Sequence, residues 1–210
     1  AVAKLCNNYF DGSAMRLNVR SEAIKEKTFV SKDIFTALER CSVIKNLRTD
    51  NGLSFVFKNS DIMKCLTKAG QLLELIIAAT AAELKENGNT VYNGVGSGVC
   101  IDWDGVLQQD SRVDVENEID VVLMKGMIPV FVSCKNGEVD SDELYKLSVV
   151  SERFGGKYVK KVLVTTQLDN MGYRAEYIRA RADDMGIKLI ENVDQMNEKE
   201  LSDMVSRLWK

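Results

Sequence analysis

The sequence contains no histidine among its 210 residues. This absence removes the usual general base, the usual activator of a nucleophile and the commonest zinc ligand. The five cysteines are odd in number and widely spaced, and no Cys-x-x-Cys pair occurs, so they resemble buried thiols of a reduced compartment. Any chemistry therefore has to use carboxylates, lysine, hydroxyl groups or a hard metal ion.

Long apolar runs and a leader peptide are also missing. No stretch approaches the roughly 18 uncharged residues that a membrane span needs. The chain does not open with a charged and then apolar leader followed by a cleavage site. We therefore expect a soluble, cytoplasmic protein without a membrane partner. A hydrophobic content of 45% is enough for one main domain and a small additional module.

Acidic residues are scarce in the first third of the chain. Residues 1–69 carry 12 Lys and Arg against 7 Asp and Glu, a net charge of +5, whereas residues 70–210 carry 16 against 24, a net charge of −8. A basic front module suits contact with phosphates, but the same charge spread over a folded surface is also ordinary. Nucleic-acid contact and a purely structural role both stay open for this module.

The front module has the pattern of a helix followed by a hairpin. Apolar positions at helical spacing predict a short amphipathic helix over 31–43. Two strands over 43–48 and 53–58 flank a turn with Asn51-Gly52, which is a strong hairpin signal. This order predicts a winged-helix-like module over residues 1–69. The alternative interpretation is a connector that packs against the next domain or pairs two subunits.

Residues 70–210 alternate between helical and strand patterns. The predicted order is αβββαβαβα, an α/β fold with a mixed sheet and helices packed on it. The glycine-rich stretch 94–98 follows a helix and opens a strand, so it predicts a flexible entry to the sheet rather than a phosphate-binding loop. The predicted helices lie near 71–87, 140–154 and 174–185 and from about 197, and the predicted strands lie near 99–103, 118–123, 128–137, 158–166 and 187–190.

Two of these strands carry ionisable side chains, Asp120 and Lys135, that an ordinary buried strand excludes. Because side chains alternate along a strand, Ser133 shares a face with Lys135, and Glu118 shares a face with Asp120. Glu74 lies in a helix with apolar residues on both sides of it, so it cannot simply face water. If the two strands pair with matching faces aligned, these groups form a carboxylate cluster with one ammonium.

Clustered carboxylates repel one another unless a cation neutralises them. Without histidine, the natural cation is a hard divalent ion such as Mg²⁺ or Mn²⁺. Such an ion lowers the pKa of its bound water and stabilises charge on a phosphate, while a lysine orients the nucleophile or meets the developing charge. The cluster predicts metal-assisted phosphodiester hydrolysis. The alternative is a buried Asp–Lys pair that only stabilises the hairpin.

Several segments within residues 70–210 together carry a family resemblance. They are Gly70-Gln71-Leu72-Leu73-Glu74, Asn117-Glu118-Ile119-Asp120-Val121-Val122-Leu123, Ser133-Cys134-Lys135-Asn136-Gly137, and the stretches 143–147 and 153–157. These segments resemble the PD-(D/E)xK nuclease superfamily, whose core is a restriction-endonuclease-like αβββαβ sheet. The resemblance narrows to the effector nucleases of type III CRISPR systems, which join a CARF sensor to such a domain, and it covers about residues 70–210.

The resemblance also implies roles for single residues. Asp120 corresponds to the metal-binding aspartate, Lys135 to the motif lysine, and Glu74 to the acid of the first helix. Ser133 completes the catalytic set, although the common motif has Asp or Glu at this position. The candidate metal ligands are Asp120, Glu74, Glu118 and Cys134.

The hydroxyl at Ser133 is a weak metal ligand. Either another acid fills the place of the missing carboxylate, or the affinity for metal is poor. The sequence offers Glu118, Glu138 and Glu143 as candidates for this acid.

The implied function is a metal-dependent nuclease that cleaves DNA, RNA or both and commonly forms a homodimer. In full-length relatives, cyclic oligoadenylate switches on the nuclease by binding an N-terminal CARF domain. These residues include no such domain, so cyclic oligoadenylate is an expected partner only if a CARF domain lies outside this chain. Two alternatives stay open: a catalytically silent module for nucleic-acid binding or dimerisation, and a resolvase or restriction-type enzyme without a sensor.

Overall fold

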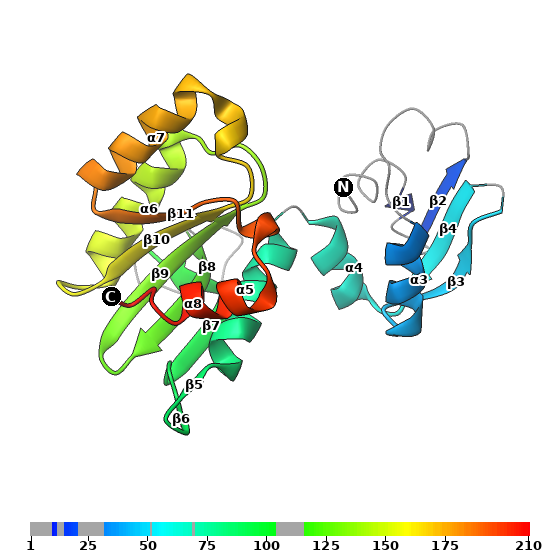
Figure 1. Ribbon diagram of the computed structural model, residues 1–210, viewed down its shortest axis with the longest axis horizontal. Coiled ribbons are helices and arrows are strands. Elements are labelled where there is room, and N and C mark those ends of the chain that lie inside the picture. The colour runs from blue at the N-terminus through cyan, green and yellow to red at the C-terminus, as the bar shows by residue number, and fades with distance from the viewer. Residues whose placement is uncertain (1–9, 12–14, 21–31, 51, 69, 104–115) are drawn as a thin grey trace, which may run out of the picture. The chain divides into compact units, whose positions relative to one another are not determined.

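The computed structural model of the chain describes residues 10–11, 15–20, 32–50, 52–68, 70–103 and 116–210 (Figure 1). The chain divides into two compact units, Ala1–Leu72 and Leu73–Lys210. The first residue of the predicted front helix, residue 31, and Asn51 in the predicted turn lie outside the described residues.

The first unit contains an antiparallel four-stranded sheet with the strand order β1-β2-β4-β3. The predicted helix and hairpin are confirmed as α3, β3 and β4, whereas β1, β2 and α4 are additions to the predicted pattern. Three phenylalanines from α3 and β4 pack against one another on the inner face of the sheet. The elements are β1 (Phe10–Asp11), β2 (Arg16–Arg20), α3 (Lys32–Arg40), β3 (Ile44–Arg48), β4 (Gly52–Phe57) and α4 (Ser60–Thr67).

The second unit is built on a mixed five-stranded sheet with the order β11-β10-β9-β8-β7. Strands β7, β8 and β9 form an antiparallel meander, and β10 and β11 continue the sheet in parallel pairing. The predicted α/β fold with a mixed sheet is therefore confirmed. The strands are β7 (Gly94–Asp102), β8 (Glu116–Lys125), β9 (Ile128–Lys135), β10 (Lys160–Thr165) and β11 (Ile187–Ile190).

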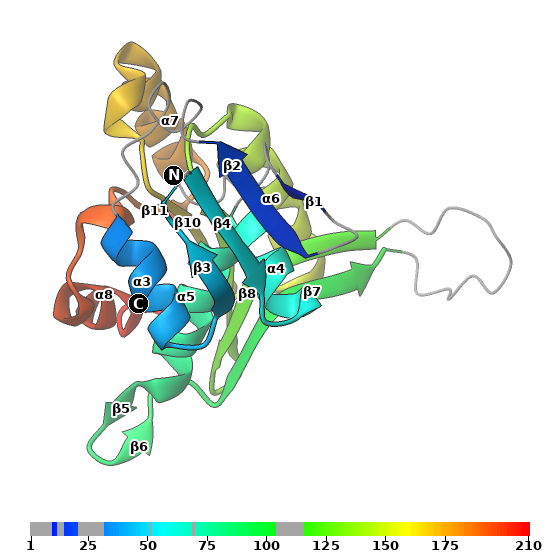
Figure 2. The same cartoon turned by 90° about the vertical axis from the view of Figure 1, so that its right-hand side faces the viewer.

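Helices cover both faces of this sheet. Figures 1 and 2 show α5 (Gln71–Glu83) and α8 (Glu198–Val205) on one face, and α6 (Ser141–Phe154) and α7 (Tyr173–Asp184) on the other. The buried apolar side chains accordingly form two clusters, one on each face. The sheet is therefore a layer between two cores, and a side chain's face decides which helices it can meet.

One detail differs from the predicted elements. Helix α5 ends at Glu83 because a small hairpin of β5 (Lys85–Glu86) and β6 (Asn89–Thr90) follows it. Asn87 and Gly88 both have positive φ, as a two-residue hairpin turn requires. The glycine-rich stretch opens a strand, as predicted, and it is itself the paired first half of β7.

Within the described residues, no single helix is both long and apolar enough to cross a membrane. Among the described helices, α4 and α5 reach that length and composition when they are counted together, but the chain bends sharply between them.

Candidate active site

Asp120 is held between β8 and β9. The backbone register of the two strands runs from Lys125 opposite Ile128 to Val121 opposite Val132. Just beyond it, the backbone N–H of Cys134 donates to Asp120 Oδ2 at 2.6 Å, and Ser133 Oγ donates to the same oxygen at 3.2 Å. Hydrogen bonds to an ionised carboxylate are among the stronger ones in proteins. They fix the orientation of this side chain.

The Asp120 side chain faces an open cleft between the sheet and α6. The cleft has a volume of about 130 Å³, well below the roughly 300 Å³ at which ordinary ligand pockets begin. It therefore suits a hydrated ion or a phosphate group better than a whole nucleotide. Its polar lining residues from β8, β9 and α6 include Glu118, Asp120, Ser133, Lys135, Glu143 and Lys146.

The ammonium group in the cleft has a carboxylate partner from α6. Lys135 Nζ lies 2.8 Å from Glu143 Oε2, and Lys146 Nζ lies 3.6 Å from Glu143 Oε1. The side chains of Lys135 and Glu143 are 30% and 25% exposed. Both are partly shielded from water, so the pair is better ordered than a fully exposed one. Glu143 thus lies between two lysines on the wall opposite the strands.

Glu118 lies beside a glycine on the neighbouring strand. A Cβ atom added at Gly98 of β7 would lie 3.3 Å from Glu118 Oε1. Gly98 also has a φ of +59°, which an L side chain rarely adopts. The absence of a side chain at Gly98 therefore leaves space for the Glu118 carboxylate at the β7 side of the cleft.

Glu74 and Cys134 do not line the cleft. Both are buried, and Cys134 packs in the core cluster beneath α5, on the face of the sheet away from α6. Burial raises the pKa of the Cys134 thiol far above its usual value, and the negative charges of Asp120 and Glu74 raise it further. The thiol is therefore protonated and poorly suited to bind a hard ion.

The structure thus brings together four of the predicted site residues: Asp120, Ser133, Lys135 and Glu118. Glu74 does not line the cleft, although its charge acts on Cys134. Of the candidate acids for the position of Ser133, Glu143 is in the cleft, whereas Glu138 is 75% exposed and lies 3.9 Å from Arg174 Nη1.

A comparison with protein-family models matches residues 70–207 to the Card1-like endonuclease domain. The chain belongs to this family. Its members are PD-(D/E)xK-type nucleases associated with CRISPR systems, so the predicted resemblance is confirmed. No curated protein sequence matches the chain at a significant level.

Two solved structures share the fold of this Card1-like endonuclease domain and its front unit. Protein VC1899 from Vibrio cholerae has 20% identity and a TM-score of 0.70, and the match covers 99% of this chain and 48% of that one. Can2 from Sulfobacillus thermosulfidooxidans, solved with cyclic tetra-adenylate, has 16% identity and a TM-score of 0.54, with coverage of 87% and 46%. The chain therefore spans about half the length of either protein.

The carboxylate oxygens in the cleft of this endonuclease domain are the kind of donor that a hard divalent ion takes. Within the described part of the chain, no three His, Cys, Asp or Glu side chains are close enough to hold an ion by themselves. Mg²⁺ is usually held by one or two carboxylates, with water and substrate phosphates as its other ligands. Asp120 with one neighbouring acid meets that requirement.

The carboxyl end of β9 is tied to β10. The backbone N–H of Thr166 donates to Lys135 O at 3.2 Å, and Thr166 Oγ1 donates to Asn136 Oδ1 at 3.1 Å. Thr165 Oγ1 donates to Gly137 O at 3.2 Å. These bonds hold the backbone that follows the motif lysine.

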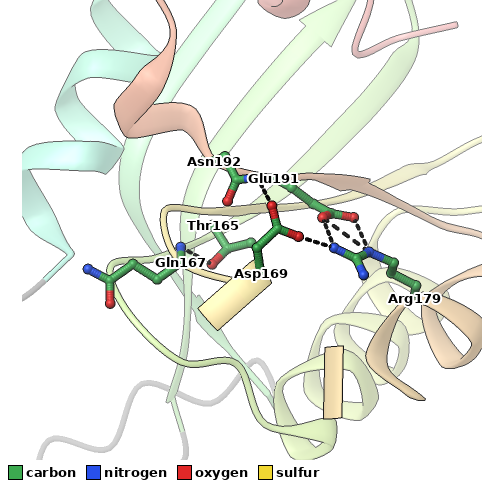
Figure 3. A network of polar contacts seen from close by, with 6 residues as sticks. All are labelled: Thr165, Gln167, Asp169, Arg179, Glu191 and Asn192. Atoms are coloured by element: carbon green, nitrogen blue, oxygen red, sulfur yellow. Dashed lines mark hydrogen bonds and ion pairs between the residues drawn. The ribbon is translucent and has the colours of Figure 1, made fainter. Parts of the chain in front are cut away.

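A charged network supports the chain beyond β10 (Figure 3). Arg179 of α7 contacts Asp169 and donates to both carboxylate oxygens of Glu191, with Nη2 2.6 Å from Glu191 Oε2. Hydrogen bonds from Asn192 and Arg179 lower the pKa of Asp169. The ion pairs link η1 (Asp169–Met171) to α7 and to the residues after β11.

Proposed function

We propose that this Card1-like endonuclease domain is a divalent-metal-dependent nuclease that hydrolyses phosphodiester bonds of DNA, RNA or both. The observation that carries the proposal is that Asp120 of β8 and Lys135 of β9 line the same small open cleft. An ordered acid, a lysine and room for one phosphate are the components that such hydrolysis requires.

We assign Asp120 and Glu143 as the acids that hold Mg²⁺ or Mn²⁺, with Glu118 as a further acid at the β7 side. When bound, the ion supplies Lewis-acid stabilisation of the phosphate and lowers the pKa of a bound water. Lys135 orients the attacking water and meets the negative charge that develops on the phosphate. Its contact with Glu143 at 2.8 Å keeps the ammonium directed into the cleft.

Glu143 supplies the carboxylate that Ser133 lacks. It comes from α6 instead of β9, but it lines the same cleft as Asp120. Two lysines already neutralise Glu143, so binding an ion requires it to exchange one of these contacts. This exchange implies a weaker metal affinity than a motif with its own Asp or Glu would give.

Restoring the motif acid at position 133 tests whether the missing carboxylate weakens the metal affinity. We expect Ser133→Asp to increase the affinity for Mn²⁺ by about tenfold, because a carboxylate replaces a hydroxyl on the same face as Asp120. Isothermal titration of Mn²⁺ into both proteins measures the change. Ser133→Ala, which only removes a donor to Asp120, is the control. An unchanged affinity in the aspartate variant would place the ion away from position 133.

The alternative function is a catalytically silent module that binds nucleic acid or forms a dimer. The observation in its favour is that Ser133 and Cys134 both donate to Asp120, which occupies one carboxylate oxygen without metal. Cleavage of labelled single- and double-stranded DNA and RNA with Mn²⁺ separates the two functions. We expect cleavage that EDTA abolishes. Absence of divalent binding together with undiminished nucleic-acid affinity in EDTA supports the silent module.

The structural match to Can2 adds a proposal about regulation. Can2 was solved with cyclic tetra-adenylate, and the chain spans about half of its length. We propose that a CARF domain outside this chain, where present, binds a cyclic oligoadenylate and controls the nuclease as part of a CRISPR defence. We also propose that the nuclease acts as a homodimer in the cytoplasm.

A further inference from the structure

The sheet of the first unit has one apolar face and one polar face. Leu17, Leu53 and Phe55 point into the core. The opposite side chains form two cross-strand rows: Arg16, Val56 and Lys45 in one, and Asn18, Ser54 and Arg48 in the other. We call these six residues the outer sheet face. All of them are exposed or partly exposed.

A β-bulge places Arg48 on this face. Lys45 pairs with Val56 but Arg48 pairs with Ser54, so β3 contains one residue more than β4 over this stretch. Regular pairing would put Leu47 opposite Ser54 and turn Arg48 toward the core, because a shift of one residue reverses the faces of a strand. With the bulge, Leu47 packs against the core and Arg48 faces outward.

The bulge is stabilised by a specific contact. Asn46 adopts the left-handed conformation at a φ of +57°, which asparagine tolerates better than most residues. The adjacent backbone N–H of Leu47 donates to Glu39 Oε1 of α3 at 2.9 Å. The Glu39 carboxylate thus accepts a hydrogen bond from a backbone N–H that the irregular strand pairing leaves without a partner in the sheet. The position of Arg48 is therefore built into the module.

The outer sheet face is hollowed around the two arginines. Two adjacent concavities of about 360 and 330 Å³ share Arg16, Arg48 and Ser54 as lining residues. Asn18 and Asn46 add amide groups, and Asp50 is the one acid in the described lining. In the described part of the chain, the ion pairs do not involve Arg16 or Arg48.

Two arginines beside hydroxyl and amide groups match the chemistry of a phosphodiester backbone. Guanidinium groups bind phosphate oxygens through two parallel N–H donors, and Ser and Asn side chains commonly add contacts to phosphate and sugar. The excess of positive charge in residues 1–69 favours the same polyanion.

We propose that the outer sheet face binds the sugar-phosphate backbone of the nucleic acid that the second unit cleaves. The proposal rests on the proposed nuclease function. It assigns the contact with nucleic acid to the exposed face of the sheet and not to helix α3. Arg16 and Arg48 bind phosphates, and Asn18 and Ser54 lie between them to contact the backbone.

Fluorescence anisotropy with a long labelled oligonucleotide in EDTA tests this surface without cleavage. We expect Arg16→Ala and Arg48→Ala each to weaken binding roughly tenfold. The magnitude of the slope of log affinity against log salt should fall by about 0.7 per arginine on a single strand. Asp50→Asn should tighten binding, because it removes the acid from the lining. The Arg16→Lys/Arg48→Lys double variant should retain most of the salt dependence of the affinity, because it keeps both positive charges.

Arg40→Ala is the matched control, because Arg40 is an exposed arginine of α3 in the same module. If it weakens binding as much as Arg48→Ala, only overall charge matters and the proposal is wrong. Unchanged binding in the Arg16→Glu/Arg48→Glu double variant would also overturn it. Circular dichroism of each variant confirms that the module remains folded.

Cleavage kinetics separate this proposal from the nuclease assignment. The double glutamate variant should raise KM on a long substrate at unchanged kcat, and it should leave a very short oligonucleotide unaffected. Loss of kcat instead would contradict a binding role. If the wild-type chain cleaves nothing but loses affinity in the double variant, the nuclease assignment fails and the binding surface stands.

Discussion

Replacing Asp120 by asparagine is expected to reduce nuclease activity by about a thousandfold or more while the domain stays folded. Asparagine keeps an oxygen that can accept the hydrogen bonds from Cys134 N–H and Ser133 Oγ, so the link between β8 and β9 is preserved. It lacks the negative charge that a divalent ion requires. The loss should therefore appear in activity and metal affinity and not in stability.

Three measurements on the same preparations check this expectation. They are the cleavage rate with Mn²⁺, the Mn²⁺ affinity by calorimetry, and the midpoint of thermal unfolding. Asp184→Asn removes an exposed carboxylate from α7, far along the chain from the cleft, and controls for the loss of one charge. Cleavage at the wild-type rate by the Asp120 variant would show that the cleft is not the active site.

The order of elements in the second unit could be predicted because each element carries a local signal. Strands β8 and β9 are β-branched runs around a Lys125-Gly126 turn, and glycines follow α6 and α7 closely. The short strands were missed for an equally local reason. β5 and β6 have two residues each and only exposed side chains, so they show no alternation of polar and apolar residues.

The sequence could predict which site residues share a face only for residues on the same strand. Alternation predicted that Ser133 lies with Lys135 and Glu118 with Asp120, because the period of a strand is two residues. All four residues line the cleft. The surroundings of Glu74 were harder to predict. Helix α5 is apolar around most of its circumference, with Leu72 and Ile76 exposed although Ile77 is buried. Such a helix has no polar stripe to indicate which of its own faces packs against the sheet, so the position of Glu74 relative to the sheet could not be predicted.

The position of Glu143 depends on tertiary structure. Its helix α6 crosses the sheet after β9, and only the packing of that helix decides that Glu143 rather than Glu138 meets Lys135. Nothing in the spacing of eight residues between Lys135 and Glu143 predicts the contact. The sequence could therefore name the candidate acids but could not choose among them.

Removing Lys135 and Glu143 singly and together should show what each contributes. We expect Lys135→Ala to lower kcat about a hundredfold to ten thousandfold, as the loss of a group that assists proton transfer or meets transition-state charge does. Glu143→Gln should lower kcat less than Lys135→Ala does, and it should weaken Mn²⁺ binding several-fold. Glutamine retains an oxygen that can coordinate the metal but loses the negative charge. Steady-state kinetics over a range of Mn²⁺ concentrations measure both effects.

The double variant decides between two roles for Glu143. If Glu143 only positions Lys135, adding Glu143→Gln to Lys135→Ala causes no further loss, because the two changes remove one interaction. If Glu143 also holds the ion, the double variant binds Mn²⁺ more weakly than Lys135→Ala alone. We expect the second result, since Glu143 is the acid from α6 that lines the cleft with Asp120. Glu138→Gln, an exposed acid outside the cleft lining, should change neither quantity.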